Sequence, residues 1–265
     1  MKKNPVMADF APQYNLFKII DKLKSVLRIV FWAIFILSLA PSLVKLLNVP
    51  VAMEDLINTA NIISIALFFL IEIAIEYILI PQADNKRRDD FIDNAFGSKF
   101  SPTPSVGYYD TEELERGLYK AASNLFENCF FSYSLTKAMT IRKTVLPAIV
   151  LLFVFAFAYY GFKGVPFALS LLQALFSATL LGNLAKHLLL ISRLSNIHDS
   201  WINVFQHDDF KANTVNYQAQ IFRIWLQYET LHSRIPSGIP DNLFKKYNKK
   251  LTQDWEVLKL RYNIK

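Results

Sequence analysis

The chain has 265 residues, a net charge of +7 and a hydrophobic content of 53%. Its apolar residues come in blocks, whereas a soluble domain would spread them by helical or strand periodicity, so the sequence indicates a membrane protein. The single cysteine, Cys129, excludes an intramolecular disulfide and is typical of a reducing compartment. The bases lie between and beyond the apolar blocks, which favours contacts with anionic lipid over nucleic acid.

Residues 1–28 precede the first apolar block and are predicted to lie in the cytosol. From residue 13 to 28, apolar side chains recur at helical spacing, and lysines occupy the other side. We interpret this stretch as a basic amphipathic helix that lies at the membrane interface or packs on the protein's own cytosolic part. Because a long charged stretch precedes the apolar block, we interpret the block as a retained span and not as a signal peptide.

Four apolar blocks are each about as long as the roughly 20 residues that cross a bilayer. They form two hairpins, residues 29–80 with spans 29–48 and 56–80, and residues 144–185 with spans 144–162 and 165–185. We expect the second helix to end before Pro81, because proline disfavours the helical conformation of the residue that precedes it. Most bases lie before the first span, in the central segment 81–143 and in the tail 186–265. The positive-inside rule therefore places both termini and the central segment in the cytoplasm.

The central segment contains a turn-rich stretch and a predicted helix. Residues 97–107 hold two prolines and three serines. Helical character returns at 111–136, where Asp110 or Thr111 would serve as the N-cap. No stretch has a convincing strand pattern. The predicted fold is therefore all-α, with four transmembrane helices in two hairpins and a helical cytosolic domain built from the central segment and the tail.

The tail is predicted to contain three helical stretches. The fourth span continues to about residue 205, and further helices cover 213–233 and 241–262. Each stretch carries one apolar stripe that we expect to face a partner helix. In chain order the stripes are His187, Ile191, Leu194, His198, Trp201 and Phe205; Val215, Ala219, Phe222, Trp225 and Tyr228; and Phe244, Tyr247, Leu251, Trp255, Leu258 and Tyr262.

Two carboxylates, Glu72 and Glu76, lie in the cytoplasmic half of the second span. Ionised groups are costly in hydrocarbon, so they mark a candidate site. Because they are four residues apart, they share one helix face and would line an ion path or form a cation-attracting ring in an oligomer. The alternative is a latch in which they pair with Lys22, Lys24 or Arg28.

Other polar side chains are candidates for the ion path or for phosphate binding. In the fourth span, Gln173 and Asn183 would line a pore wall or, in our preferred interpretation, join helices by hydrogen bonds. Two basic stretches would bind a phosphate group, such as a nucleotide messenger, or anionic lipid, unless they are simply solvated. These stretches contain Lys86, Arg87 and Arg88 in the central segment, and Lys245 and Lys246 in the tail.

The sequence predicts neither a metal site nor an enzyme. The four histidines are dispersed and lack a ligand-like spacing to a second base or thiol. The chain has no glycine-flanked serine and no phosphate-binding glycine loop, and the surroundings of Cys129 resemble a buried helix position. We therefore expect no metal, no cofactor and no catalytic residue.

A set of short motifs indicates a family. The residues that carry the resemblance are Asp90, Phe91, Asp93, Phe96 and Gly97 after the first hairpin, and Tyr228, Glu229, Ile239, Pro240 and Trp255 in the tail. In this order and layout the chain resembles the SMODS-associated four-helix transmembrane proteins of bacterial anti-phage defence. The resemblance implies a pore-forming effector of the bacterial inner membrane that stays silent until a cytosolic partner or a nucleotide signal triggers it.

Two functions from different classes are compatible with these patterns. The first is an effector that oligomerises and permeabilises or depolarises the membrane, with the path between protomers because one copy has few polar wall residues. The second is a non-conducting, membrane-anchored sensor or scaffold that recruits a cytosolic partner through its helices. A transporter is disfavoured, since the spans lack the breaks that build a midplane site.

Overall fold

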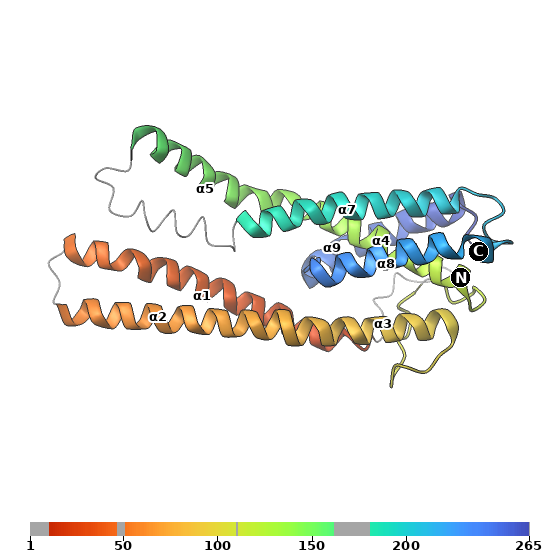
Figure 1. The fold of residues 1–265 in the computed structure, drawn as a ribbon, viewed down its shortest axis with the longest axis horizontal. Helices are drawn as coiled ribbons and strands as arrows, with labels where there is room; N and C mark the ends of the chain where they lie inside the picture. The colour runs from red at the N-terminus through yellow and green to blue at the C-terminus, as the bar shows by residue number, and fades with distance from the viewer. Residues whose placement is uncertain (1–10, 47–50, 110, 162–180, 265) are drawn as a thin grey trace. The chain divides into compact units, whose positions relative to one another are not determined.

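The computed structural model describes residues 11–46, 51–109, 111–161 and 181–264, and the regular secondary structure in these ranges is helical (Figure 1). The all-α prediction is confirmed. The chain divides into two compact units, which we name the apolar unit and the polar unit. The apolar unit comprises Phe17–Pro81 and Ile141–Ala185, and the polar unit comprises Met1–Leu16, Gln82–Thr140 and Lys186–Lys265.

The described part of the apolar unit is built on long helices. In chain order they are α1 (Tyr14–Leu46), α2 (Val51–Ile73), the π-helix η1 (Ala74–Leu79) and α5 (Thr140–Tyr160). Helices α1 and α2 run side by side (Figure 1), and the Asn61 side-chain amide donates to Ser38 Oγ across 3.2 Å. These two helices therefore form a hairpin.

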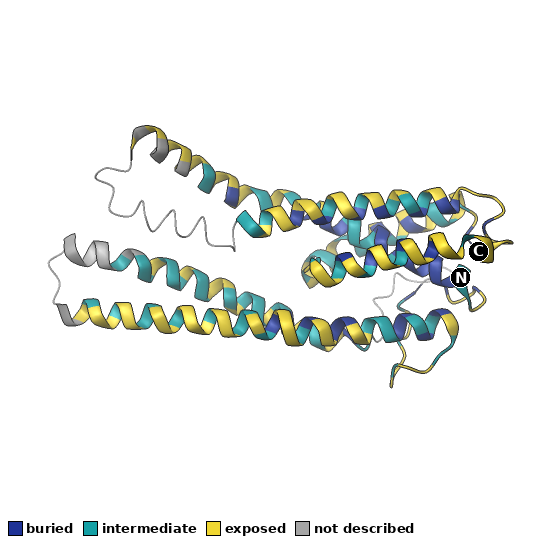
Figure 2. Ribbon diagram, in the orientation of Figure 1, coloured by how far each residue is buried: buried dark blue, intermediate teal, exposed yellow. Residues whose placement is uncertain are grey.

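Helix α2 exposes apolar side chains along its length (Figure 2). Among the described residues, Met53–Phe96 is the one helix that is long and apolar enough to cross a membrane, and only 6% of its most apolar stretch is buried. Leu56 and Ile62, for example, are each 68% exposed. The core helix of a soluble protein would bury such a face, so this helix favours membrane association.

The expectation that this helix ends before Pro81 is wrong, because α3 (Ile80–Phe96) follows η1 without a break. Proline lacks an N–H and its ring clashes with the carbonyl four residues earlier in a regular α-helix. Here the preceding turn is π-helical, and the Ile80 N–H donates to the Ile75 carbonyl five residues back. The wider turn admits the proline without ending the helix.

The polar unit contains the remaining described helices. After α3 they are α4 (Leu118–Ala138), α7 (Leu181–Phe205, whose last twenty residues belong to this unit), the 3₁₀-helix η2 (Thr214–Tyr217), α8 (Gln218–Arg234) and α9 (Asp241–Arg261). Helices α7, α8 and α9 gather around α4 (Figure 1).

The core of the polar unit lies along α4, where buried positions dominate (Figure 2). Phe126 is fully buried, and its ring stacks on Phe205 of α7 with centroids 5.2 Å apart. The Phe126 ring also meets Trp255 of α9 edge-on at 5.3 Å. Aromatic pairs of this kind add to the stabilisation from burial alone. They join three helices at one point.

The predicted start of α4 is wrong. The helix begins at Leu118 and not near residue 111, and Gly117 precedes it with a φ of 143°, a conformation that favours glycine. Thr111 is no N-cap, because its hydroxyl donates to the Asn124 side chain inside the core. The alternative cap, Asp110, lies outside the described residues.

Two of the three predicted stripes in the tail are confirmed. On α7, His187, Leu194, Trp201 and Phe205 are buried, and on α9, Leu251 and Trp255 are buried. The other α9 members pack partly buried against the same core, and they are Phe244, Tyr247, Leu258 and Tyr262. Residues 165–180 of the predicted fourth span lie outside the described residues.

The predicted face of α8 is right for Tyr228, which is buried, and for Trp225, which packs against the core, but wrong for its other members. Its buried side chains are Ile221, Ile224, Tyr228 and Leu231, whereas Val215, Ala219 and Phe222 are exposed and Trp225 is half-buried. Two apolar stripes run next to each other on this helix. The core takes the stripe with the isoleucines and leaves the one with Phe222 at the surface.

Candidate functional site

Asp90 and Asp93, two of the resemblance residues, bind the loop that follows α3. Asp93 Oδ1 accepts hydrogen bonds from Ser98 Oγ and the Phe100 N–H, both at 2.8 Å, and Oδ2 accepts one from the Ser101 N–H at 2.7 Å. Burial opposes the charged form of Asp93, but these donors outweigh it and lower the pKa of the carboxyl. Asp90 accepts from the Ser105 N–H at 2.6 Å, and burial raises its pKa.

Gly97 lets the chain leave α3 at the required angle. Its φ is +76°, and its N–H donates to the Asp93 carbonyl at 2.8 Å, as in a helix C-cap. A Cβ at this position would lie 2.5 Å from the Arg116 side chain. The positive φ and the nearby Arg116 side chain therefore explain why glycine follows Phe96 in the motif.

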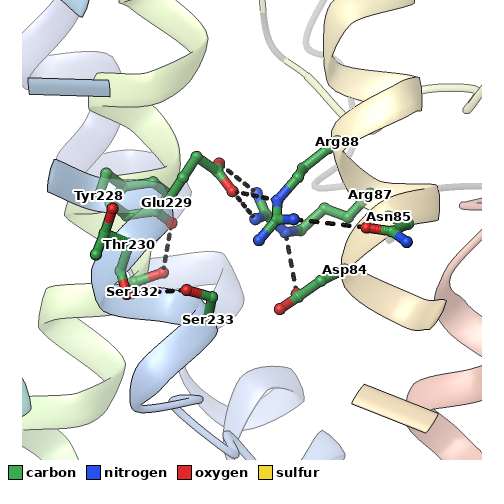
Figure 3. A network of polar contacts seen from close by, with 9 residues as sticks. All are labelled: Asp84, Asn85, Arg87, Arg88, Ser132, Tyr228, Glu229, Thr230 and Ser233. Atoms are coloured by element: carbon green, nitrogen blue, oxygen red, sulfur yellow. Dashed lines mark hydrogen bonds and ion pairs between the residues drawn. The ribbon is translucent and has the colours of Figure 1, made fainter. Parts of the chain in front are cut away.

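Arg87 and Arg88 of α3 converge on one carboxylate, that of Glu229 on α8 (Figure 3). Arg87 binds it through both terminal nitrogens, at 2.6 Å to Oε2 and 3.2 Å to Oε1, and Arg88 Nε donates to Oε2 at 2.8 Å. The side chains of Arg87 and Glu229 are only 12% and 15% exposed. We name this group of three residues the clasp.

Charges around the clasp are arranged to keep it ionised. Burial opposes the charged form of Glu229, but Arg87 and Arg88 outweigh it and hold the pKa of this carboxyl below its usual value. Asp84, one turn earlier on α3, lies 3.6 Å from Arg87 Nε (Figure 3). Burial raises the pKa of Asp84 even though Arg87 lies nearby. Glu229 is therefore the main counter-ion of the two arginines.

Tyr228 and His232 flank the clasp on α8. Tyr228 is buried, and its hydroxyl shares a 3.1 Å hydrogen bond with Ser132 Oγ of α4 (Figure 3). The His232 ring lies 4.5 Å from the Tyr228 ring. Burial, with Arg87 next, lowers the pKa of His232 to about 3, so the imidazole is neutral at physiological pH.

Aromatic rings link the other resemblance residues to α8 and α9. Phe91 is buried and meets Trp225 edge-on at 5.1 Å, and Phe96 stacks on the same indole at 6.5 Å. Trp255 is fully buried against Phe126, in the core described above. The structure thus brings the motif residues of the central segment and of the tail into one unit.

The basic residues predicted to bind phosphate differ in their surroundings. Arg87 and Arg88 already bind Glu229, and Lys86 beside them is exposed. On α9, the Lys245 ammonium lies 3.4 Å from Asp241, and Lys246 lies over the Tyr247 ring at 5.6 Å. The sequence suggested that Arg87 and Arg88 bind a phosphate group. In the structure their partner is a carboxylate of the same chain, that of Glu229.

The glutamates of the second span lie where the helix changes geometry. Glu72 is half-buried at the end of α2, and Glu76 is exposed within η1. Burial lowers the pKa of Lys24 on α1, whereas the charges of Asp21 and Glu76 oppose this shift. Lys24 is thus the nearby base that the structure assigns to Glu76.

The other latch and pore candidates lie at the helix surface or outside the described ranges. Lys22 is exposed, and the Arg28 guanidinium donates to Ser25 Oγ at 2.9 Å on its own helix. Asn183 is exposed on α7, whereas Gln173 lies outside the described residues.

The described part of the chain offers two features for reactive chemistry, its possible metal ligands and the thiol of Cys129. No three histidine, cysteine or carboxylate side chains come together there as metal ligands. Cys129 is fully buried, and this burial raises the pKa of its thiol, which makes it a weak nucleophile.

The sequence did not reveal the clasp as a unit. Arg87 was a phosphate candidate and Glu229 a motif residue, but their pairing joins positions 142 apart. One feature of the sequence pointed to a pairing of Glu229. This glutamate is the single acidic residue in the sequence of α8, and this helix has one buried face. A lone acid beside such a face needs a basic partner.

The described residues define a class of protein. It is an all-α protein with one candidate membrane helix and a polar helical unit, and in this unit the clasp joins α3 to α8. The chain matches no family model, and no curated protein and no solved structure matches it. The expected family therefore rests on the resemblance of the motif residues alone, and these comparisons assign the chain to no family.

Proposed function

We propose that the protein is an effector of the SMODS-associated four-helix transmembrane type, which oligomerises and permeabilises the bacterial inner membrane when a cytosolic signal releases it. The observation that carries this proposal is the exposed apolar surface of α2. Contiguous apolar surface of this extent marks an interaction with lipid or with other copies. A membrane-permeabilising oligomer needs both contacts.

The proposal includes four spans with both termini in the cytoplasm. The described helix Met53–Phe96 supplies one span, and the apolar parts of α1, α5 and residues 165–185 supply the other three. The distribution of bases in the sequence supports this orientation. The polar unit then lies on the cytoplasmic side, where a signal can reach it.

Glu72 and Glu76 are the residues that we propose to line the conducting path. Exposed Glu76 and half-buried Glu72 occupy the end of the apolar stretch, next to Lys24. Carboxylate rings select cations in oligomeric channels. In the oligomer, these side chains from several copies would form such a ring.

Membrane-potential measurements in cells test this function. Induction of the wild-type protein is expected to depolarise cells, and Glu72→Ala with Glu76→Ala is expected to weaken this effect at equal protein level. The matched control is Glu112→Ala with Glu113→Ala, two exposed glutamates of the polar unit, which should depolarise like wild type. Full depolarisation by the first pair removes the carboxylates from the path, and the function is overturned if neither overproduced wild type nor any variant of the chain depolarises cells.

A surface on α8 favours the second candidate, a non-conducting scaffold. Phe222 is 44% exposed and stacks on Trp225, and Leu226 beside them is 66% exposed. Exposed aromatic and aliphatic side chains of this kind anchor protein partners. If Phe222→Asp with Leu226→Asp abolishes the biological effect in cells whose membranes stay polarised throughout, the scaffold replaces the pore.

A further inference from the structure

The attachment of α3 to α8 depends on charge to an unusual degree. Two neighbouring arginines bind one carboxylate, and the bidentate Arg87 contact fixes both the distance and the orientation of Glu229. These are the described hydrogen bonds that join α3 to α8, next to the ring contacts of Trp225 with Phe91 and Phe96.

The apolar contribution of α3 to the core is small. Its buried apolar side chains are Ile80, Ala83, Phe91 and Ala95, and two of these four are alanines, whereas three further buried side chains are carboxylates. Two of these, Asp90 and Asp93, bind the loop that follows α3 and no other helix. By contrast, α4 is buried among aromatic and aliphatic residues from three helices. Helix α3 is therefore held by few large apolar side chains and by polar contacts, which include the hydrogen bond that the Asn124 amide of α4 donates to Asn94 Oδ1 at 2.8 Å.

Buried ion pairs make an attachment specific and reversible. Replacing such a pair with apolar side chains is often neutral or stabilising, whereas removal of one partner leaves a buried charge without compensation and is strongly destabilising. A helix that only had to stay in place would be held at least as well by apolar side chains. The attachment at the clasp instead depends on the balance of three charges.

The position of the clasp connects it to the membrane helix. Met53–Phe96 is unbroken, so α3 and the apolar stretch of α2 are parts of one backbone helix. The π-helical turn η1 lies between them, and such turns are points where a helix adjusts its register. The backbone of α3 is thereby continuous with that of the segment that carries Glu72 and Glu76.

We propose that Arg87, Arg88 and Glu229 form a releasable autoinhibitory contact, which holds α3 on α8 and keeps the membrane helix in its silent state. This proposal rests on the proposed function, because silence is defined by an intact membrane potential. Opening of the clasp loosens the attachment of α3 to α8 while the core around α4, to which Phe91 and Ala95 belong, stays folded. The clasp is a regulatory contact and takes no part in conduction.

Two variants that both remove the ion pair, with opposite expected effects, test the proposal. In Glu229→Gln the two arginines keep their charge but lose their main counter-ion, so the attachment of α3 to α8 is loosened. In the triple variant Arg87→Met, Arg88→Met and Glu229→Leu, apolar side chains of similar size replace the charges and hold α3 in place. Glu256→Gln is the matched control, because Glu256 is 52% exposed and pairs with Lys259 at 2.6 Å on the surface of α9.

Each variant is studied as the full chain in membranes, at equal protein level, by depolarisation and by amide hydrogen exchange. Glu229→Gln is expected to depolarise cells about tenfold more than wild type, and to exchange faster in residues 82–96 while α4 stays protected. The triple variant and Glu256→Gln should match wild type in both measurements. Arg88→Gln, which changes a more exposed member, should have the same effect as Glu229→Gln but smaller.

The outcomes separate the two proposals. If wild type depolarises cells and Glu229→Gln does so no more than Glu256→Gln, the clasp is no autoinhibitory contact and the proposed function stands. If the triple variant depolarises cells as strongly as Glu229→Gln while hydrogen exchange shows α3 still held in place, release of α3 is not what activates the protein and the clasp proposal is overturned. If neither wild type nor any variant depolarises cells, the proposed function fails, and with it the regulatory role.

Discussion

Of helices α2 and α4, the more apolar one, α2, is exposed, and the more polar one, α4, is buried. Helix α2 is rich in leucine, isoleucine and alanine, yet it is largely exposed. Helix α4 buries polar side chains, among them Ser123, Asn124 and Glu127. Burial within one chain thus follows from the presence of partner helices and not from hydrophobicity alone. An apolar helix that the chain itself does not cover needs a partner outside the chain, and lipid is the simplest one.

The largest expected effect is in the core around α4. Trp255→Ala removes a fully buried indole that contacts Phe126, and it should lower the free energy of unfolding of the polar unit by about 3–5 kcal/mol. Thermal unfolding followed by near-UV circular dichroism measures this. The control, Leu260→Ala, changes a side chain that is 72% exposed on the same helix and should leave the transition in place. Equal stability of both variants would contradict this account of the core.

Two arginine substitutions test whether an exposed side chain faces lipid or water. Ile62 on α2 and Leu226 on α8 are 68% and 66% exposed. Ile62→Arg should disfavour membrane insertion by about 2.5–3.5 kcal/mol, as charges do at the centre of a span, whereas Leu226→Arg should have almost no effect. Carbonate-resistant protein in the membrane fraction measures insertion. Equal insertion of the two variants would contradict the interpretation that α2 faces lipid and α8 faces water.

The loop after α3 should depend on one carboxylate. Asp93→Ala removes the acceptor of three hydrogen bonds from Ser98, Phe100 and Ser101 and should lower stability by about 1–3 kcal/mol. We expect faster proteolysis in residues 97–107, checked by limited trypsin digestion and mass spectrometry, with cleavage after Lys99. Asp89→Ala, at a half-buried neighbouring position on α3, serves as the control. Unchanged cleavage would show that the loop is held by other contacts.

The smallest effect is a pH dependence of the polar unit. The folded pKa of His232 is lowered to about 3, below the unfolded value near 6.5, so the unfolded chain binds the extra proton between these values. Stability should therefore fall as the pH decreases below 6.5, by up to about 1.4 kcal/mol per pH unit. Although burial opposes both shifts, the mutual pairing of Arg87 and Glu229 lowers the pKa of Glu229 and raises that of Arg87, so both stay charged between pH 7.5 and 5.5.

Unfolding curves at pH 7.5 and 5.5 check this dependence. His232→Phe should remove most of the difference between the two curves, because phenylalanine cannot bind the proton. The same loss of stability at pH 5.5 in wild type and variant would assign the dependence to another group.

Periodicity predicted the features of the fold that depend on local sequence. The stripes of α7 and α9 were correct because one apolar face dominates each helix, as around Trp201 and Trp255. On α8 two apolar stripes compete, so the buried face around Ile221 depends on the neighbouring helices. Continuation past Pro81 depends on a π-helical turn, for which the sequence has no clear signal.

The candidate site was predictable only in parts. The sequence singled out Asp93 as a motif residue, but the contacts of its carboxylate depend on a loop that folds back onto α3. The clasp depends on a tertiary contact between helices from distant parts of the chain. Composition identified the basic run with Arg87, and only the packing of α3 on α8 identifies its counter-ion, Glu229.

The central claim is that the exposed face of α2 lies in lipid, and labelling with a membrane-impermeant maleimide tests it most directly. Native Cys129 is fully buried and unreactive in the folded protein, so single cysteines can be added to the full chain. In native membranes opened to give access from both sides, Leu226→Cys should be labelled quickly and Ile62→Cys at less than about a tenth of that rate, since thiols react as thiolates in water. Labelling of Ile62→Cys as fast as Leu226→Cys would contradict the claim.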